Sequence, residues 1–205
     1  MYMNEKKRTA SAAHRGPEGR GQPLNYAQRN RRRIRRLAEG AIIAALYVAL
    51  TWLANAVGLS GMAVQVRFSE ALCVLTLFTP AAVPGLWVGC MLANLTTGAM
   101  MWDIVFGSLA TLVGALGGWS LGCLSRRMKR DGHVLRAAAM KWLIPLPTVV
   151  ANTVTVPLIL IYAYALEGSF PLFALTVGIG ELVSAWFLGL LLMFPLERKE
   201  KMIFK

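Results

Sequence analysis

The chain has 205 residues, of which 56% are apolar and 16% charged, and its mean hydropathy is +0.52. A soluble domain of this length carries more charge and is less hydrophobic, so the composition excludes a soluble globular fold and indicates a membrane protein. The net charge of +12 is typical of nucleic-acid-binding proteins, but the distribution of the charge favours another interpretation.

The basic residues gather in three segments. Eleven of the 22 lysines and arginines precede residue 37, six lie in 126–141 and four in 198–205, which leaves Arg67 alone among the apolar runs. Because basic residues collect on the cytoplasmic side of a membrane, we expect both termini and the 126–141 loop to be cytoplasmic. The arginine run at 29–36 is interpreted as a segment that faces an anionic leaflet, and no nucleic-acid partner is predicted.

Three parts follow along the chain. Residues 1–36 have little aliphatic content and predict a disordered basic cytoplasmic tail. Residues 37–197 predict one transmembrane domain, because apolar runs near the ~20 residues of a spanning helix recur there. Residues 198–205 predict a basic cytoplasmic C-terminal tail. The first apolar run, 37–58, is interpreted as a retained helix, since the charged region before it argues against a signal peptide.

The stretch 68–95 decides the number of spans. Pro80 and Pro84 interrupt it, and a proline disfavours helix at the residue before it, which predicts a break at Thr79. Counting one span here would put the basic 126–141 loop outside, whereas two spans or a re-entrant hairpin return it to the cytoplasm. The fold class predicted is therefore an all-α membrane protein, a bundle of six transmembrane helices; the remaining spans are 104–124, 142–166 and 170–195.

Small residues recur at helical spacing on three of these spans. Ala41, Ala45 and Ala49 form a stripe on the first, and glycines repeat every four residues at 85 and 89 and at 114, 118 and 122. Such faces let helices approach closely in lipid. The glycine stripes predict packing inside the bundle. The alanine stripe leaves two readings open, internal packing or a docking face for another membrane protein.

Four ionisable groups lie within or beside the spans. Placing such a group in a membrane costs free energy, so each of the four is a candidate functional residue. The predicted topology places these groups and two asparagines in the outer half of the bundle, which indicates a water-accessible cavity open to the outside. The candidate substrate-binding residues are Arg67, Glu70, Asn94, Asp103, Asn152 and Glu181.

Four of the candidates also have a structural interpretation. Arg67 and Glu70 are three residues apart and could form a private ion pair. Asp103 could be a helix N-cap, and Asn152 could bridge two helices. Glu181 has no cation near it in sequence, which favours a ligand role.

The four charges comprise one cation and three anions, which suits a ligand with a cationic group or a donor-rich edge, because a carboxylate accepts two adjacent N–H donors. Trp102, Phe106 and Trp186 are expected to line the pocket, so a planar aminated heterocycle would fit.

The motifs of common catalytic sites are missing from the sequence. His14 and His133 lie outside the spans, and there is no HExxH, G-x-S-x-G or Walker-type phosphate loop. We therefore predict neither catalytic residues, metal nor cofactor. Three alternatives to a binding component stay open: a solo ion-coupled carrier with Glu181 as proton site, a membrane enzyme using Glu70, Asp103 and Glu181 on lipid or isoprenoid substrates, and a structural partner without a ligand.

Several runs together resemble the queuosine precursor transporter (QueT) family: Arg67-Phe-Ser-Glu70, Thr79-Pro-Ala-Ala-Val-Pro84-Gly85, Gly89-Cys-Met-Leu-Ala93-Asn94, Asp103-Ile-Val-Phe-Gly107-Ser-Leu-Ala-Thr111-Leu112 and Gly180-Glu181. The resemblance covers about residues 38–197 and is densest through 67–112. Members of this family are six-helix substrate-binding (S) components of energy-coupling-factor (ECF) transporters.

The resemblance implies a 7-deazaguanine ligand such as preQ1 or preQ0, captured from outside a bacterial cell membrane. It also implies that the alanine stripe of residues 41, 45 and 49 meets an ECF coupling protein. Two separate ATPase subunits would then supply the energy, which fits a chain that has no ATPase loop.

Overall fold

The computed structural model describes residues 26–59 and 66–203; the predictions for residues 1–25 and for most of the outer loop near 59–66 lie outside the described residues. The chain divides into two units, residues 1–34 and residues 35–205, and apart from the first residues of one helix the fold described below is that of the second unit. Throughout its described part this unit is helical, and no strand occurs there, which confirms the predicted all-α class.

The first described helix, α2, runs from Tyr26 to Ala56. The prediction of disorder up to residue 36 is therefore wrong for residues 26–36. Arginine, glutamine and alanine favour helix, and a helix already formed by the apolar run extends through them without a new nucleus. Arg35 and Glu39 add an i,i+4 ion pair of 2.9 Å.

Two short helices occupy the stretch interrupted by prolines. The first, η1, is a 3-10 helix from Phe68 to Leu77, and the second, α3, is an α-helix from Ala82 to Thr96. The break predicted around Thr79 is confirmed. At about 2.0 Å per residue in a 3-10 helix and 1.5 Å in an α-helix, each helix covers only about 20–23 Å, less than a hydrocarbon core of about 30 Å.

Every residue of η1 from Ser69 to Leu77 is buried. A helix that is buried on all sides lies at the centre of a bundle, and η1 packs against α3, α4, α8 and η3, whose bounds are given below. This central position matters for function, because η1 carries Glu70 and begins directly after Arg67.

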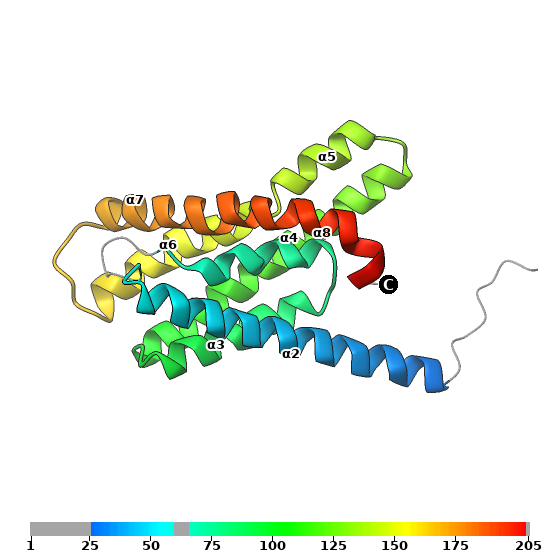
Figure 1. Cartoon of the computed structure of the whole chain (residues 1–205). Helices are drawn as coiled ribbons and strands as arrows, with labels where there is room; N and C mark the ends of the chain where they lie inside the picture. Colours follow the sequence, from blue (N-terminus) through cyan, green and yellow to red (C-terminus); the bar gives the residue numbers. More distant parts are fainter. Residues whose placement is uncertain (1–25, 60–65, 204–205) are drawn as a thin grey trace, which may run out of the picture. The chain divides into compact units, whose positions relative to one another are not determined.

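The C-terminal half forms long helices with irregular turns inside them. A π-helical segment, η2 (Asp103–Gly107), leads into α4 (Ser108–Arg130). The segments α7 (Phe170–Glu181), η3 (Leu182–Leu188, π-helical) and α8 (Gly189–Ile203) follow one another as one continuous helix (Figure 1).

Between α4 and α7 lie α5 (Val134–Trp142) and α6 (Leu146–Tyr162), and α6 packs against both α4 and α7. Four helical stretches of the described chain are long and apolar enough to cross a membrane: Tyr26–Ala56, Asp103–Arg130, Val134–Tyr162 and Phe170–Lys199. The protein is therefore a helical bundle of the multi-pass membrane class, and the count of six complete crossings stays a prediction.

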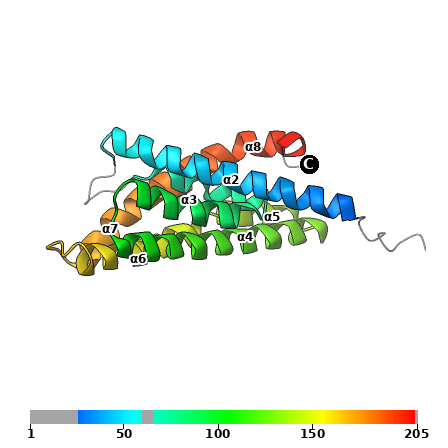
Figure 2. The same cartoon turned by 90° about the horizontal axis from the view of Figure 1, so that it is seen from below.

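The glycine stripes pack inside the bundle, as predicted. A Cβ on Gly85 would lie 2.8 Å from the carbonyl oxygen of Gly40, and one on Gly89 would lie 2.7 Å from the Cβ of Tyr47. A Cβ on Gly114 would meet Thr148 of α6 at 2.7 Å. The missing side chains let α3 lie directly against α2 and let α4 lie against α6 (Figure 2).

Candidate functional site

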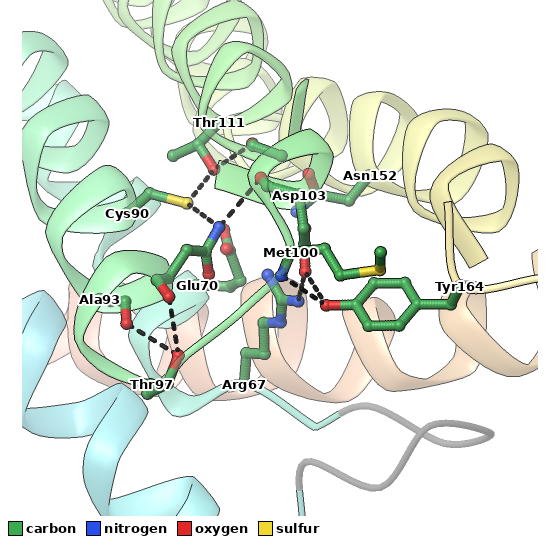
Figure 3. A network of polar contacts seen from close by, with 12 residues as sticks. Arg67, Glu70, Cys90, Ala93, Thr97, Met100, Asp103, Thr111, Asn152 and Tyr164 are labelled. Atoms are coloured by element: carbon green, nitrogen blue, oxygen red, sulfur yellow. Dashed lines mark hydrogen bonds and ion pairs between the residues drawn. The ribbon is translucent and has the colours of Figure 1, made fainter. Parts of the chain in front are cut away.

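Arg67, Asn94 and Asp103 form a polar cluster, called the outer layer below, that joins three segments of the bundle. The guanidinium of Arg67, just before η1, lies 3.9 Å from the Asp103 carboxylate at the start of η2. The Tyr164 hydroxyl, from the loop after α6, donates to Asp103 Oδ2 at 3.5 Å and accepts from the Met100 backbone N–H at 3.2 Å (Figure 3). Arg67 therefore interacts beyond its own helix, and Asp103 lies inside a helical turn without capping it.

Asn94 fixes the end of α3 against this layer. Its Nδ2 donates to the backbone oxygen of Asp103 at 3.2 Å and lies 3.8 Å from the Cys90 sulfur. The Cys90 sulfur also accepts from the Thr111 hydroxyl at 3.3 Å (Figure 3). Gly107 leaves the space that the Asp103 carboxylate fills, because a Cβ there would lie 2.7 Å from Asp103 Oδ1. The Asp103 side chain is thus held by its surroundings on several sides.

A cavity of about 210 Å³ opens over the outer layer. Polar side chains from α2, α3, η2 and the loops between the helices surround it. It is lined by Thr51, Asn55, Arg67, Asn94, Thr97, Gly98, Ala99, Asp103, Leu160 and Tyr164. Small-molecule sites are typically about 300–1,000 Å³, so a ligand the size of a heterocycle requires this cavity to widen.

An inner layer, defined here as Glu70, Asn152 and Glu181, does not border the cavity. The Tyr47 hydroxyl of α2 donates a hydrogen bond to Glu70 Oε1. The Asn152 Nδ2 of α6 donates to Glu181 Oε1 of α7 at 3.0 Å. Asn152 therefore does bridge two helices, and the acceptor it holds is a buried carboxyl rather than a backbone group.

Two carboxyl oxygens of the site lack a partner. Asp103 Oδ1 and Glu181 Oε2 are buried and form no hydrogen bond with any group that the structure describes. Buried polar atoms are nearly always paired, and an unpaired one needs a specific explanation. Both residues also adjoin π-helical turns, Asp103 opening η2 and Glu181 preceding η3, and such turns are frequent at functional sites. A ligand that donates hydrogen bonds would satisfy both oxygens.

Backbone and hydroxyl contacts connect the inner parts of the site. The Thr51 hydroxyl of α2 donates to Ser69 Oγ at 2.9 Å, and the Arg67 backbone N–H donates to Ser184 Oγ in η3 at 3.0 Å. The start of η1 is therefore held from both sides, by α2 and by η3. This contact set positions Arg67 and Glu70 together.

The structure brings all six predicted site residues into these two layers, with three in each: Arg67, Asn94 and Asp103 outside and Glu70, Asn152 and Glu181 inside. Their role in binding stays a prediction. Sequence reasoning missed Tyr47, Thr51 and Tyr164. The first two lie four residues apart in α2 and share the buried face, a polar spacing that could have pointed to them; nothing in the sequence singled out Tyr164.

The prediction that Trp102, Phe106 and Trp186 line the polar cavity is wrong, because none of them borders it. Trp102 and Phe106 stack on each other, with ring centroids 5.7 Å apart, beside a separate apolar pocket. Trp186 packs against a core cluster. Large apolar rings gain more from lipid-facing or core positions than from a cavity lined by charges; Tyr164 supplies the aromatic ring instead.

The alanine stripe lies outside the packed face of α2. Ala41, Ala45 and Ala49 are exposed, whereas Ala44 and Tyr47 between them are buried. Internal packing, one of the two readings of this stripe, is therefore excluded for the described chain. An exposed face of small side chains lets another helix approach closely.

Comparison with known proteins identifies a family for this chain. The model of the QueT transporter family matches residues 37–198, which is most of the chain. Searches of curated proteins and of solved structures gave no match. The matched range contains both polar layers, the cavity and the alanine stripe, and on this basis the chain belongs to the QueT transporter family.

Proposed function

We propose that the protein is the substrate-binding component of an ECF-type importer and captures a queuosine precursor, a 7-deazaguanine such as preQ1 or preQ0, from outside the cell. The family match over residues 37–198 carries this proposal. The family is one of transporters, which argues against an enzyme that uses Glu70, Asp103 and Glu181.

The chemistry of the two layers supports a ligand of this kind. A deazaguanine presents adjacent N–H donors along its guanine-like edge, and carboxyl oxygens are the strongest acceptors for such groups. Asp103 Oδ1 and Glu181 Oε2 are both buried and unpaired within the described chain. We propose that the six residues of the two layers bind the ligand.

The proposed orientation follows from charge. Both termini and the 126–141 loop carry the basic residues and lie in the cytoplasm of a bacterial cell, with six crossings of its membrane. The cavity then opens to the outside, at the end of the bundle where α2 and α3 end and η1 and η2 begin.

The exposed alanine stripe is the proposed docking face for the coupling protein. Its three small side chains leave a shallow surface on α2, while the opposite face of the same helix carries Tyr47 and its bond to Glu70. One helix would therefore contact both the partner and the binding site. Two ATPase subunits, separate from this chain, would supply energy for release.

Ligand binding by the purified protein tests the proposal directly. We expect preQ1 or preQ0 to raise the melting temperature and to give a saturable heat in calorimetry, without turnover and without added ion. Adenine, a planar base with a different donor pattern, is the control. Absence of binding by every 7-deazaguanine up to high micromolar concentration would remove the substrate assignment.

A solo ion-coupled carrier is the second candidate, because the unpaired oxygen of Glu181 is also what a proton site would present. Uptake by proteoliposomes that contain only this chain distinguishes the ion-coupled carrier from the ECF component. We expect binding but no accumulation of labelled ligand. Accumulation driven by a proton gradient alone would favour the carrier and contradict the ECF mechanism.

A further inference from the structure

The carboxyl groups of the site outnumber its cation. Arg67 is the single basic side chain of the two layers, against Glu70, Asp103 and Glu181, and all three carboxyls are at least nine-tenths buried. Arg67 forms an ion pair with Asp103, and whichever further group it contacts, one positive charge cannot balance three negative ones. Buried charges are stable only when they are paired, so the site lacks positive charge.

The inner layer contains no basic side chain of its own, and the single charge of Arg67 acts on Glu70 and Glu181 as well as on Asp103. Glu181 has Asn152 as its hydrogen-bond partner, and Asn152 also interacts with the Glu70 carboxyl. A carboxamide group has two N–H hydrogens, so Asn152 can hold one carboxyl on each side. Glu70 and Glu181 lie near enough for their charges to interact. Two acidic groups thus flank one neutral amide.

Protonation of Glu181 does not give its Oε2 atom a hydrogen-bond partner. An ionised Oε2 is an acceptor without a donor, and a protonated Oε2 is a hydroxyl without an acceptor, because the described chain offers this atom no partner. Either state leaves a buried polar group unsatisfied. A ligand group that is both a donor and a cation satisfies the atom and balances its charge at once.

We propose that Glu70 and Glu181 bind a positively charged amine on the ligand, so that the site selects a 7-deazaguanine with an ammonium substituent over one with an uncharged substituent. This inference rests on the proposed function and adds the charge of the substrate to it. Asp103 and Asn94, which line the cavity, would then face the heterocycle, and the amine would extend from it towards Glu70 and Glu181.

Two ligands separate this inference from the function itself. PreQ1 carries an aminomethyl group that is protonated at pH 7, and preQ0 carries a neutral nitrile in the same position. We expect calorimetry at pH 7 to show about 10- to 100-fold tighter binding of preQ1, the range of a charge-assisted hydrogen bond. We expect Glu181→Gln and Glu70→Gln to bring the ratio of the two dissociation constants towards one.

Glu197→Gln is the matched control, because Glu197 pairs with Lys141 at 2.7 Å away from the two layers; it should leave the ratio unchanged. Equal binding of the two ligands, or tighter binding of preQ0, overturns the inference and leaves the proposed function standing. Binding of neither ligand overturns the proposed function. A preference for preQ1 that survives both site variants places the amine elsewhere and also overturns the inference; if either variant fails to fold, the other variant and the native protein still decide.

Discussion

Replacing Gly89 with alanine should separate α2 from α3 and disturb the site from a distance. A Cβ at this position would lie 2.7 Å from the Cβ of Tyr47, 3.0 Å from the Cα of Ala44 and 3.1 Å from its carbonyl oxygen. Two of these three atoms belong to the backbone, so no side-chain rotation relieves the contact. The helices themselves have to move apart.

The magnitude follows from two opposing effects. Overpacking a tight contact costs about 1–3 kcal/mol, while alanine gains up to about 1 kcal/mol over glycine in helix propensity. The net destabilisation expected for Gly89→Ala is therefore about 1–2 kcal/mol. For a chain of this length that corresponds to a fall in melting temperature of about 2–8 °C. Movement of Tyr47 also loosens its bond to Glu70, so ligand affinity should fall as well.

Gly178→Ala in α7 is the control, because a Cβ there meets only Thr153, at ordinary contact distances of 3.4 and 3.5 Å. Melting curves of both variants in the same detergent, with and without ligand, measure the difference. We expect Gly178→Ala to match or exceed the native melting temperature. If Gly89→Ala is equally stable and binds as well, the close approach of α2 and α3 has no energetic weight and the reasoning fails.

Three further changes test other parts of the site. Ala45→Leu should spare ligand binding but abolish uptake with coupling subunits present, because a large side chain blocks the docking face. Tyr164→Phe removes a donor to Asp103 and an acceptor for the Met100 N–H, and we expect about 2- to 10-fold weaker binding in a ligand titration. Gly107→Ala puts a Cβ 2.7 Å from Asp103 Oδ1 and should displace the carboxylate, weakening binding without loss of membrane insertion.

Each of these three predictions can be contradicted by a stated result. Val113→Phe, which adds four carbons at an exposed position on α4 against the three added by Ala45→Leu, should not affect uptake. Equal uptake by the Ala45 variant would mean that the stripe faces lipid only. Native affinity after Tyr164→Phe would show that the outer layer acts without this hydroxyl. Unchanged binding by Gly107→Ala would mean that Asp103 does not contact the ligand.

Much of the fold could be predicted because each membrane span is determined by residues that are close in sequence. The apolar runs, the break at Thr79 and the internal glycine stripes follow from hydropathy, proline chemistry and spacing, which act between residues close in sequence. The start of α2 was misjudged at residue 37 for the converse reason: charge suggested disorder, whereas arginines joined to an existing helix continue it from Tyr26.

The site residues were found from the sequence because ionisable groups stand out against apolar runs, but their partners were not. Arg67 was weighed as a partner of Glu70, three residues away, and the ion pair that it forms with Asp103, 36 residues further along, was not foreseen. Tyr47 and Tyr164 look like interfacial or core aromatics until the helices come together. Pairing between distant segments depends on packing, which no local pattern encodes.

The sequence alone determined that this chain is a helical membrane protein with six candidate polar groups, since burial in lipid constrains each span by itself. Only the tertiary structure decided which of these groups meet and that they form two layers. It also showed that Asp103 and Glu181 each keep an oxygen without a hydrogen bond to any described residue. It also decided that Ala41, Ala45 and Ala49 face outward while Tyr47 of the same helix holds Glu70. The physical reason is that the side a helix presents to its neighbours is set by the whole bundle, and the residues of one helix cannot fix it.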